Sequence, residues 1–436
     1  MHAPYTGVRF MMRPNGRAFK DERVTIMAFG LTKKELSWVL YDVGNSAFVM
    51  LSTALIPVYF ASIADPGSSV VVAWGYAETV ASLVLALLMP VLGSLADLAG
   101  NKKKFLVGFA GTGAVACAAL GVPEHALAFL VVYVIAAIML NGSMVFYDAF
   151  LVDATTEERY DKVSSHGYAW GYIGSCIPFI ACLAVVLGGS SFGIDAKLGM
   201  KIAFIITAVW WVVFTVPVAK NVKQLHGKKR SDHVLRTTIS GLKGTVKSIM
   251  KDKRLLFFML AFFFYIDGVH TVIKMSTSYG TDLGIDSTQL VLALLVTQFV
   301  AFPSAIAYGN LAKHFGTKRM LKVGVLAYFF IVLFAAFFLK SAVEFWILAI
   351  CVGLFQGGIQ ALSRSEYGKL IPKERANEYY GFFDIFGKYA AVMGTFLVSA
   401  FTQLTGSSSL GVLSIALLFI VGYLFLRAMP PMLGDS

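Results

Sequence analysis

The amino-acid sequence predicts an all-α membrane protein with twelve transmembrane helices, arranged as two pseudo-symmetric six-helix halves. Three observations lead to this prediction: the composition, the spacing of the apolar runs and an internal repeat. Of the 436 residues, 57% are hydrophobic and only 14% are charged, and the mean hydropathy is +0.72. Soluble globular proteins carry roughly 25% charged residues. The composition therefore indicates a chain that is mostly embedded in lipid.

Twelve apolar runs follow one another along the chain, each about 20 residues long, which is the length that a helix needs to cross a hydrocarbon layer about 30 Å thick. A single long break at 220–254 separates the first six runs from the last six. We therefore expect a first half at 36–219, a linker at 220–254 and a second half at 255–427. The ends, 1–35 and 428–436, are expected to form an N-terminal extension and a tail. The runs are centred near residues 50, 84, 113, 138, 177, 209, 267, 300, 330, 355, 390 and 418.

Lysine and arginine residues are concentrated in every second connector between the runs. The connectors near 65–70, 122–124, 281–287 and 404–408 contain neither residue. This alternation is the positive-inside pattern. It predicts a multi-pass protein of the cytoplasmic (inner) membrane, with both termini and the linker in the cytoplasm. The basic connectors carry Lys102, Lys103 and Lys104, then Lys313, Lys318 and Arg319, then Arg364, Lys369, Lys373 and Arg375.

The linker at 220–254 is strongly basic, with eleven Lys or Arg residues against two Asp. A short amphipathic helix is expected within it, near 235–250. The net charge of the chain is +12, but its placement on one side of the predicted membrane favours topology and anionic headgroups as the reason, so no nucleic-acid partner is expected. A solvated charge run is the simpler interpretation of the linker, and a specific binding role is the alternative.

The two halves of the chain repeat one another. GSLADLAGNKKK at 93–104 aligns with GNLAKHFGTKRM at 309–320, an offset of 216 residues. A constant offset across several features indicates duplication of a six-helix unit. Two such halves around a central cavity can rock against each other and so give alternating access. The same offset relates Glu158-Arg159 to Glu374-Arg375, and Gly171 to Gly387.

The loop after the second run carries a recognisable pattern, Gly93-x-x-x-Asp97-x-x-Gly100-x-Lys102-Lys103. It resembles the loop signature between the second and third helices of the major facilitator superfamily. The resemblance implies that these five residues form contacts that latch the outward-facing state of a transporter. In the second copy Lys313 stands where the acid would be, so we expect the latch in the first copy only.

Four further segments, in order along the chain, narrow the resemblance. They are WVLYDVGNSAF at 38–48, the stretch at 146–174 that begins FYDAFLVDATTEER, FYIDGVHTVIKM at 264–275, and the stretch at 357–394 that begins GGIQALSRSEYGKL. All four are similar to bacterial relatives of the autophagy-related vacuolar amino-acid effluxers, also described as an "unknown major facilitator" family. The resemblance implies a transporter fold, and an amino acid or similar metabolite as the solute.

Ionisable residues inside the seventh run are the strongest candidates for a transport pathway. Asp267, His270 and Lys274 share one helical face because they are spaced by three and four. A charged residue at the centre of a membrane helix costs about 2.5–3.5 kcal/mol, so such residues mark solute or proton pathways by default. We expect Asp267 to carry a coupling proton, and His270 either to carry protons or to pack. The other expected pathway residues are Tyr41, Asp42 and Asn45 of the first run, with Gln298, Gln360 and Lys388.

A second set of charges lies near the predicted cytoplasmic face. These residues are expected to form salt bridges between the two halves rather than to bind solute. Asp42 and Asp384 fit either the pathway or the gate. The set comprises Asp148, Asp153, Glu158, Arg159, Arg364, Glu374 and Arg375; together with Asp384 and the loop residues, its members Asp148, Arg159, Arg364 and Arg375 form the expected gate.

The sequence gives little support to an enzyme. It has no GxxxxGK[ST] loop for ATP, and the GxSxG match at 189–193 lies in a connector without a preceding strand. The four cysteines fall inside apolar runs and form no CxxC pair, so neither a disulfide framework nor a metal site is expected. We expect no enzymatic activity and no cofactor.

The sequence therefore predicts a monomeric secondary transporter that moves a small polar solute by alternating access, coupled to protons. An alternative with the same fold is an exporter of hydrophobic drugs, which the many aromatic residues favour and the buried charges disfavour. An alternative of another class is a non-transporting receptor or scaffold that recruits a partner through the basic linker. Deletion of the linker separates these classes, because a scaffold loses its phenotype and a transporter keeps residual flux.

Overall fold

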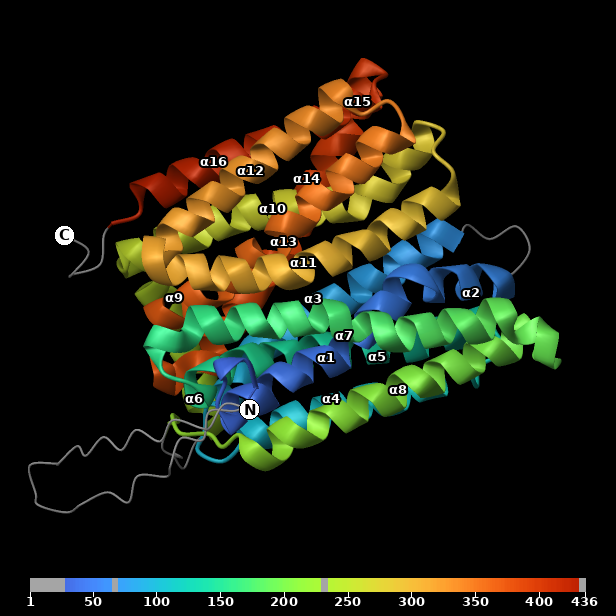
Figure 1. Ribbon diagram of the computed structural model, residues 1–436. Helices are drawn as coiled ribbons and strands as arrows, with labels where there is room; N and C mark the ends of the chain where they lie inside the picture. The colour runs from blue at the N-terminus through green and yellow to red at the C-terminus, as the bar shows by residue number, and fades with distance from the viewer. Residues whose placement is uncertain (1–27, 65–69, 229–233, 431–436) are drawn as a thin grey trace, which may run out of the picture.

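The computed structural model describes residues 28–64, 70–228 and 234–430. These residues form α-helices joined by short turns (Figure 1), and the expected all-α fold is confirmed. Most of the predicted N-terminal extension and of the tail lies outside the described residues. Apart from helices, the described chain contains one isolated β-bridge, between Leu98 and Lys228.

The first span is a bent pair of helices. α1, Lys33–Ala54, begins with a capping box in which Thr32 accepts from the Glu35 backbone N–H and the Glu35 carboxylate accepts from the Thr32 N–H. α2, Ile56–Ile63, follows after one residue at an angle of 44°. Pro57 explains the break, because proline lacks the N–H that would continue the helix but suits its first turn.

The remaining helices divide at α9, Val234–Lys251. Before it come α3 Val70–Ala96, α4 Lys102–Ala119, α5 Ala126–Ala149, the short α6 Leu151–Ala154, α7 Tyr160–Gly188 and α8 Ala196–Asn221. After it come α10 Lys253–Asp282, α11 Ser287–Phe315, α12 Thr317–Phe338, α13 Ala342–Leu370, α14 Ala376–Thr405, α15 Ser408–Ser414 and α16 Ala416–Ala428. Four short 3-10 turns complete the described chain: Ala28–Gly30, Glu157–Arg159, Gly189–Phe192 and Lys373–Arg375.

Nine of the described helices are individually long and apolar enough to cross a membrane, and the bent pair α1–α2 makes a tenth span. With α4 and α14, the described chain has twelve long helical segments besides α9. α4 opens with three lysines and is otherwise rich in Ala and Gly. α14 carries Glu378, Asp384 and Lys388. α14 packs against α3, α5 and α10, so its polar residues do not mark a surface helix.

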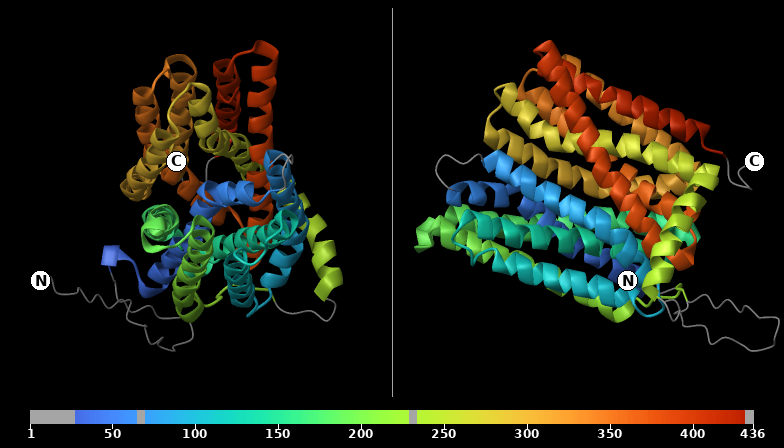
Figure 2. Two further views of the ribbon diagram at one scale, coloured as in Figure 1. Left: turned by 90° about the vertical axis from the view of Figure 1, so that its right-hand side faces the viewer. Right: turned by 180° about the vertical axis from the view of Figure 1, so that it is seen from behind.

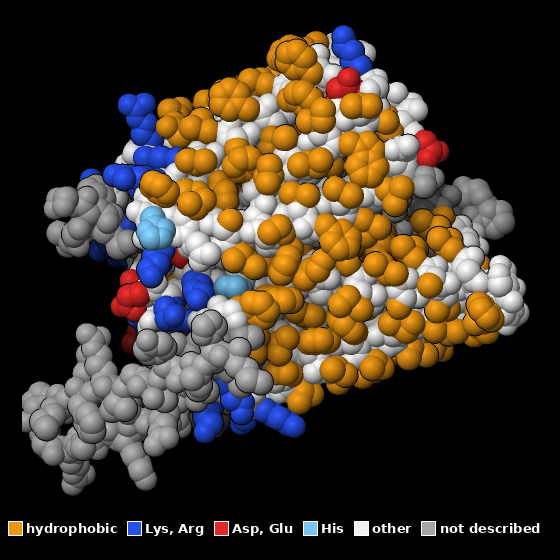
Figure 3. All heavy atoms as spheres, viewed as in Figure 1, with side chains coloured by type: hydrophobic (Ala, Val, Ile, Leu, Met, Phe, Trp, Pro, Cys, Tyr) orange, Lys and Arg blue, Asp and Glu red, His pale blue; other side chains and the backbone are white. Residues whose placement is uncertain are grey.

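The helices before and after α9 form two groups that lie side by side (Figures 1 and 2). The seam between the groups is formed where α3 and α5 contact α14, and where α7 contacts α11 and α13. Hydrophobic side chains cover the middle of the visible surface, and most of the Lys and Arg side chains gather at one end (Figure 3). We name this end, which carries α9 and the connectors at 97–101, 155–159 and 371–375, the basic end.

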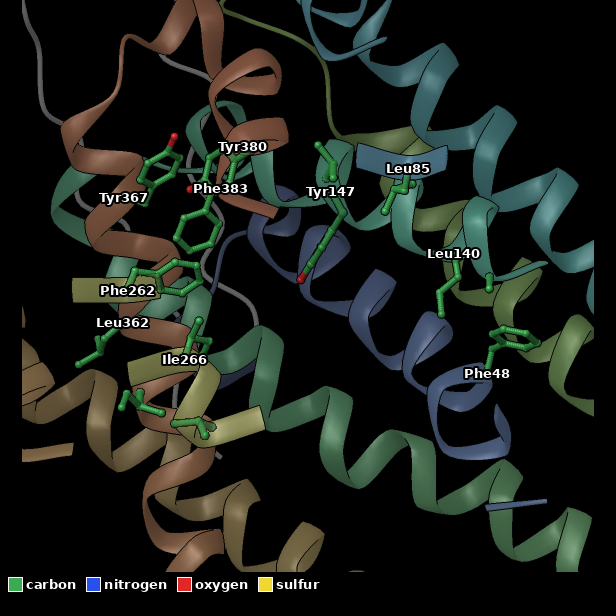
Figure 4. Packing of buried hydrophobic residues seen from close by; sticks show 14 of the residues in the cluster. Phe48, Leu85, Leu140, Tyr147, Phe262, Ile266, Leu362, Tyr367, Tyr380 and Phe383 are labelled. Atoms are coloured by element: carbon green, nitrogen blue, oxygen red, sulfur yellow. The ribbon is translucent and has the colours of Figure 1, made fainter. Parts of the chain in front are cut away.

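Aromatic stacking ties the second group together near the basic end. The rings of Phe262 and Phe383 are stacked with centroids 3.9 Å apart, and those of Tyr367 and Phe383 are 4.5 Å apart (Figure 4). Tyr380 closes the cluster with an edge-on contact to Tyr367 at 5.2 Å. Such pairs contribute about 0.5–1.5 kcal/mol each beyond burial. They hold α10, α13 and α14 as a unit, which fixes the helix ends that meet the first group.

Candidate functional site

Asp97 joins the two groups of helices at the basic end. It follows the last residue of α3 and is 1% exposed. Its Oδ1 accepts from the backbone N–H of Asn377 at 2.9 Å and from the Asn377 side-chain amide at 2.8 Å, and its Oδ2 accepts from the Glu378 N–H at 3.1 Å. These N–H groups belong to the first turn of α14, where no carbonyl of the helix itself can accept them. A carboxylate of one half therefore caps a helix of the other.

Gly93 makes this approach possible. A Cβ atom at position 93 would lie 2.5 Å from the Asn377 carbonyl oxygen, closer than real Cβ contacts allow. Gly100, three residues after Asp97, has a φ of +82°, which favours glycine and turns the chain into α4. Burial of the Asp97 carboxyl raises its pKa to about 6, and the nearby Lys102 and Lys228 together with the hydrogen bonds from Asn377 oppose that rise.

The repeat copy in the second half makes a different contact. Gly309, the counterpart of Gly93, packs against α7, where a Cβ atom would lie 2.6 Å from the Cβ of Ser165. Lys313, the counterpart of Asp97, is exposed. The acid is instead on the facing helix: Asp161 of α7 accepts from Lys369 Nζ at 2.7 Å and Thr317 Oγ1 at 2.8 Å. Both copies thus contact the opposite half, but only the first does so through its own carboxylate.

Arg364 is a buried charge at the seam. It lies on α13 and is 1% exposed. Its Nη1 donates to Asp148 Oδ1 of α5 at 2.9 Å, and its Nε and Nη2 donate to the hydroxyl and carbonyl oxygens of Ser164 on α7, both at 2.9 Å. Asp42 Oδ2 of α1 lies 3.7 Å from Nη1 and accepts from the Tyr147 hydroxyl at 3.2 Å. One cation of the second half is therefore held by three helices of the first.

Aromatic rings enclose the Arg364 guanidinium. Its central carbon lies 4.3 Å from the ring centroid of Tyr168, 4.7 Å from that of Trp38 and 5.2 Å from that of Tyr147. The Trp38 indole N–H donates to the Tyr147 carbonyl oxygen at 2.9 Å, and this bond holds the two rings in place beside the guanidinium. Removal of one partner from such a buried pair leaves an uncompensated charge and costs about 3–5 kcal/mol.

The expected salt bridges between the halves are only partly present. The expectation is correct for Asp148 and Arg364. It is wrong for Arg159, which pairs with Glu35 of its own half at 2.6 Å, and for Arg375, which pairs with Glu378 of its own half at 2.9 Å. It is also wrong for Asp153. Each of these three side chains pairs with a residue at the start of a helix of its own half.

Lys102 also pairs within the first half. Its Nζ, which is fully buried, donates to Asp153 Oδ2 at 2.6 Å and to the Ala149 carbonyl at 3.2 Å. It therefore braces α4 against α5 and α6, whereas Lys103 is half-buried. Asp153 Oδ1 additionally accepts from the backbone N–H groups of Leu225 and His226, both at 2.8 Å. These contacts attach the chain after α8 to α6.

The beginning of the linker takes part in the contacts between the two groups of helices at the basic end, which the sequence did not predict. Gln224 Oε1 accepts from the Gly100 N–H at 2.9 Å, and the Lys228 N–H donates to the Asp97 carbonyl at 2.8 Å. The Lys228 ammonium pairs with Glu378 Oε2 at 2.6 Å and lies 4.0 Å from Asp97 Oδ2. Nothing distinguishes Lys228 from the other linker lysines in the sequence. The sequence also missed Ser164, Asp161, Lys369 and Tyr168, because their partners are distant in the chain.

The structure separates the charged residues of α10. Asp267 is fully buried, and its Oδ1 accepts from the Gly394 N–H of α14 at 3.0 Å and from Thr271 Oγ1 at 3.2 Å. Its Oδ2 has no hydrogen-bond partner within the described part of the chain. A Cβ atom at position 394 would lie 2.6 Å from Asp267 Oδ1, so a larger residue there would displace this side chain. Lys274 is exposed and His270 is half-buried.

The first-helix candidates also point in different directions. The Tyr41 hydroxyl donates to Ser143 Oγ at 2.6 Å, and the Asn45 amide donates to the Tyr41 carbonyl at 3.1 Å, so both bond within the first half. Only Asp42 reaches the seam. Gln360 reaches it from the second half, where its Oε1 accepts from the Tyr172 hydroxyl at 3.4 Å. Gln298 and Asp384 are half-buried, and the side chain of Lys388 lies outside the described residues.

An open pocket of about 340 Å³ lies beyond Asp267, toward the end opposite the basic end. It is formed between α10, α14 and α15, and it begins at Met275 and Val398. At a rise of 1.5 Å per residue these two positions are about 12 Å and 6 Å from Asp267 and Gly394 along their helices. The polar residues that line this pocket are Tyr279, Ser399, Thr402, Gln403 and Ser408.

Comparisons with known proteins agree on the type of molecule. Residues 67–431 match the family described as vacuole effluxer Atg22 like. The MFS-type transporter YxiO of Bacillus subtilis is 45% identical over 408 residues, which cover 92% of this chain and 95% of YxiO. Autophagy-related protein 22 of Cryptococcus neoformans is 26% identical over 283 residues, 60% of this chain and 48% of that protein. The major facilitator superfamily transporter FucP in its outward conformation superposes with a TM-score of 0.70 at 13% identity, over 92% of this chain and 99% of FucP.

Proposed function

The chain belongs to the Atg22-like family of the major facilitator superfamily, and on that premise we propose that it carries an amino acid or a similar small polar metabolite by alternating access, coupled to protons. It is a multi-pass membrane transporter and not an enzyme. Carboxylates and cations close together at the seam suit a zwitterionic or anionic solute. Because each chain contains both halves of the gate, a monomer is sufficient for the cycle that we propose.

The polar closure of the seam at the basic end is the observation that carries the proposal. The inter-half hydrogen bonds and ion pairs described above all lie between the basic end and Tyr172, twelve residues into α7. Hydrogen bonds can be exchanged for water when the halves separate, whereas a dry apolar seam would resist opening. We infer that the structure is closed at the basic end, and that opening breaks the Asp97 and Arg364 contacts.

The positive-inside pattern supports a cytoplasmic position for the basic end. In this orientation both termini and the linker lie in the cytoplasm, the protein resides in the cytoplasmic membrane, and the closed seam corresponds to an outward-facing state. The direction of transport follows from the gradient of the solute and the proton.

Asp267 is the proposed proton carrier. Its Oδ2 atom is free of hydrogen bonds among the described residues, while Oδ1 joins α10 to Gly394 of α14. The pocket between the same two helices offers protons a route from the far end. Protonation removes a buried charge at the α10–α14 contact, and we propose that this lets the two helices shift when the gate opens.

The alternatives have weaker support. The scaffold hypothesis needs a linker that is available to a partner, but Gln224 and Lys228 are bonded to the gate. The drug-exporter hypothesis needs an apolar central site, whereas the seam holds Asp42, Asp148 and Arg364. Neither alternative is needed to explain a contact in the structure.

The proposal is tested in vesicles containing the purified protein, with a solute identified first by thermal-shift screening of a metabolite panel. An imposed pH gradient should drive accumulation of that solute by the unmodified protein. Asp267→Asn keeps the size and the hydrogen bonds of the side chain but cannot titrate, so it should abolish proton-driven accumulation and retain solute exchange. Normal pH-driven uptake by Asp267→Asn would show that Asp267 is structural, and the absence of any amino-acid-like solute would contradict the proposed solute class.

A further inference from the structure

α9 lies across the ends of the membrane spans at the basic end. In Figure 2 it runs at a steep angle to the long helices, at the edge of the bundle, and it contacts α3 and α10. Lys253, two residues after the end of α9, is the first residue of the α10 span. A helix that ends where a membrane span begins lies at the level of the lipid headgroups.

The inner face of α9 is fastened to the gate. Thr245 is fully buried and Ile249 is 7% exposed. The Thr245 hydroxyl bonds to Glu378 Oε1, and Arg375 Nη2 bonds to the same hydroxyl. Glu378 is also the residue whose backbone N–H donates to Asp97. A movement of α9 therefore acts on the residue that the proposed latch holds.

The outer face of α9 combines apolar side chains with a row of lysines. Val246 is 43% exposed and Met250 is 65% exposed, although both are hydrophobic. At 100° per residue, these two side chains lie between the buried Thr245–Ile249 face and a row of exposed lysines one turn apart. The row consists of Lys243, Lys247 and Lys251.

This arrangement matches a membrane surface that carries negative charge. Apolar side chains of such a helix enter the boundary between headgroups and acyl chains, while the neighbouring lysines pair with anionic headgroups. We propose that α9 binds the anionic phospholipids of the leaflet at the basic end, and that through Thr245 this binding holds the Asp97 latch closed. The lipid site stands on the geometry of α9 alone, and the link to the latch rests on the proposed function.

Lipid binding is tested on the full-length protein in nanodiscs of phosphatidylcholine, with and without phosphatidylglycerol. An environment-sensitive fluorophore is attached at Met250→Cys in a Cys351→Ala background, because the other three cysteines are buried. We expect a blue shift of the emission in the anionic discs. Loss of three lysines should weaken the lipid contact on the order of 100-fold and abolish the shift. The triple variant Lys243→Gln/Lys247→Gln/Lys251→Gln supplies this loss.

A matched control removes the same charge elsewhere at the basic end. Lys104, Lys220 and Lys223 are exposed there and lie on other elements. The variant Lys104→Gln/Lys220→Gln/Lys223→Gln should keep the blue shift. The lipid site is overturned if the control loses the shift equally, or if the fluorophore reports the same environment with and without phosphatidylglycerol, as it would if a second copy or another protein segment covered this face.

The link to the latch has its own measurement. Hydrogen exchange at the Asn377 and Glu378 amides reports the Asp97 contact directly, because both amides donate to Asp97. Exchange should be slower in anionic discs than in neutral discs, and Thr245→Val should remove this difference while the label at position 250 keeps its blue shift. Equal exchange in both lipids would overturn the link. The fluorescence readout involves no transport, so failure of the lipid site is distinguishable from failure of the proposed function.

Discussion

The two copies of the repeated loop make opposite use of charge at equivalent places. In the first copy Asp97, on the loop, caps the start of α14. In the second copy the loop carries Lys313, and the acid, Asp161, lies on α7, the helix that the loop faces. The glycines at 93 and 309 pack against the opposite half in both copies. Duplication has thus kept the close backbone contact and changed the side of the seam that supplies the carboxylate.

This difference separates the part of the repeat that shapes the fold from the part that we assign to the proposed gate. Glycine packing is common to both copies and gives the halves their shared seam. The capping of a helix start by a buried carboxylate occurs in one copy, so the two sides of the gate need not open with the same free energy. Arg364 and Asp148, themselves 216 positions apart, meet between the two loops.

The largest effect is expected from removing the charge that both sides of the gate share. Arg364→Met should lower the free energy of unfolding by about 3–5 kcal/mol, because the buried Asp42 and the partly buried Asp148 are left without a cation. The measurement is a denaturation midpoint in detergent, with Lys313→Met as a control that removes an exposed charge. A loss below about 1 kcal/mol would mean that water or another cation compensates, and the seam would be wetter than the burial of Arg364 indicates.

A smaller and one-sided effect is expected from the two loops themselves. Asp97→Ala should destabilise the closed seam by about 2–3 kcal/mol, since the Asn377 and Glu378 N–H groups lose their acceptor. Lys313→Ala should change it by less than about 0.5 kcal/mol, as is usual for an exposed surface residue. Hydrogen exchange at residues 377 and 378 gives the first value, and transport of the identified solute should fall in the same order. Equal defects in the two variants would refute the asymmetry.

Some features of the fold and of the seam were predictable from the sequence because they are periodic or repeated. Helix count follows from apolar length, and Asp97 follows from the loop pattern. The contacts of Asp267 did not follow, because the spacing of three and four places residues on one helical face but does not say which neighbour that face meets. It meets Gly394 of the same half. Lys228 was hidden because eleven Lys or Arg residues of the linker have the same chemistry.

The pH dependence of the first loop is the next effect in size. Burial raises the pKa of Asp97 to about 6 from an ordinary value of 3.8, so the closed seam binds a proton more tightly than a solvated aspartate does. The stability that this proton contributes is present below pH 3.8 and is lost as the pH rises to about 6. Two pKa units correspond to about 2–3 kcal/mol, of which we expect about 2.

The control for this prediction is the variant Asp97→Asn, whose side chain has no carboxyl group to titrate. The difference in melting temperature between the unmodified protein and Asp97→Asn should change between pH 4 and pH 6 in favour of Asp97→Asn, and stay level above that range. A melting-temperature difference that stays constant from pH 4 to pH 6 would contradict the prediction. It would show that Asp97 does not titrate in this range and that this side of the seam is not sensitive to pH there.

The smallest expected effect tests whether the second copy can be given the chemistry of the first. Lys313→Asp alone should not create a second latch, because Asp161 stands at the position that Asn377 occupies in the first copy, and two carboxylates at one contact repel. Asp161→Asn alone should weaken the contacts with Lys369 and Thr317. Combined, the two changes restore the aspartate–asparagine pair, so the double variant should be more stable than the sum of the single effects by about 1 kcal/mol, within the range of coupling between neighbouring residues. A double-mutant cycle on the melting midpoint measures this coupling. A value of zero would show that the backbone at the start of α7 cannot present its N–H groups to position 313, and the asymmetry of the gate would then lie in the helix positions as well as in the side chains.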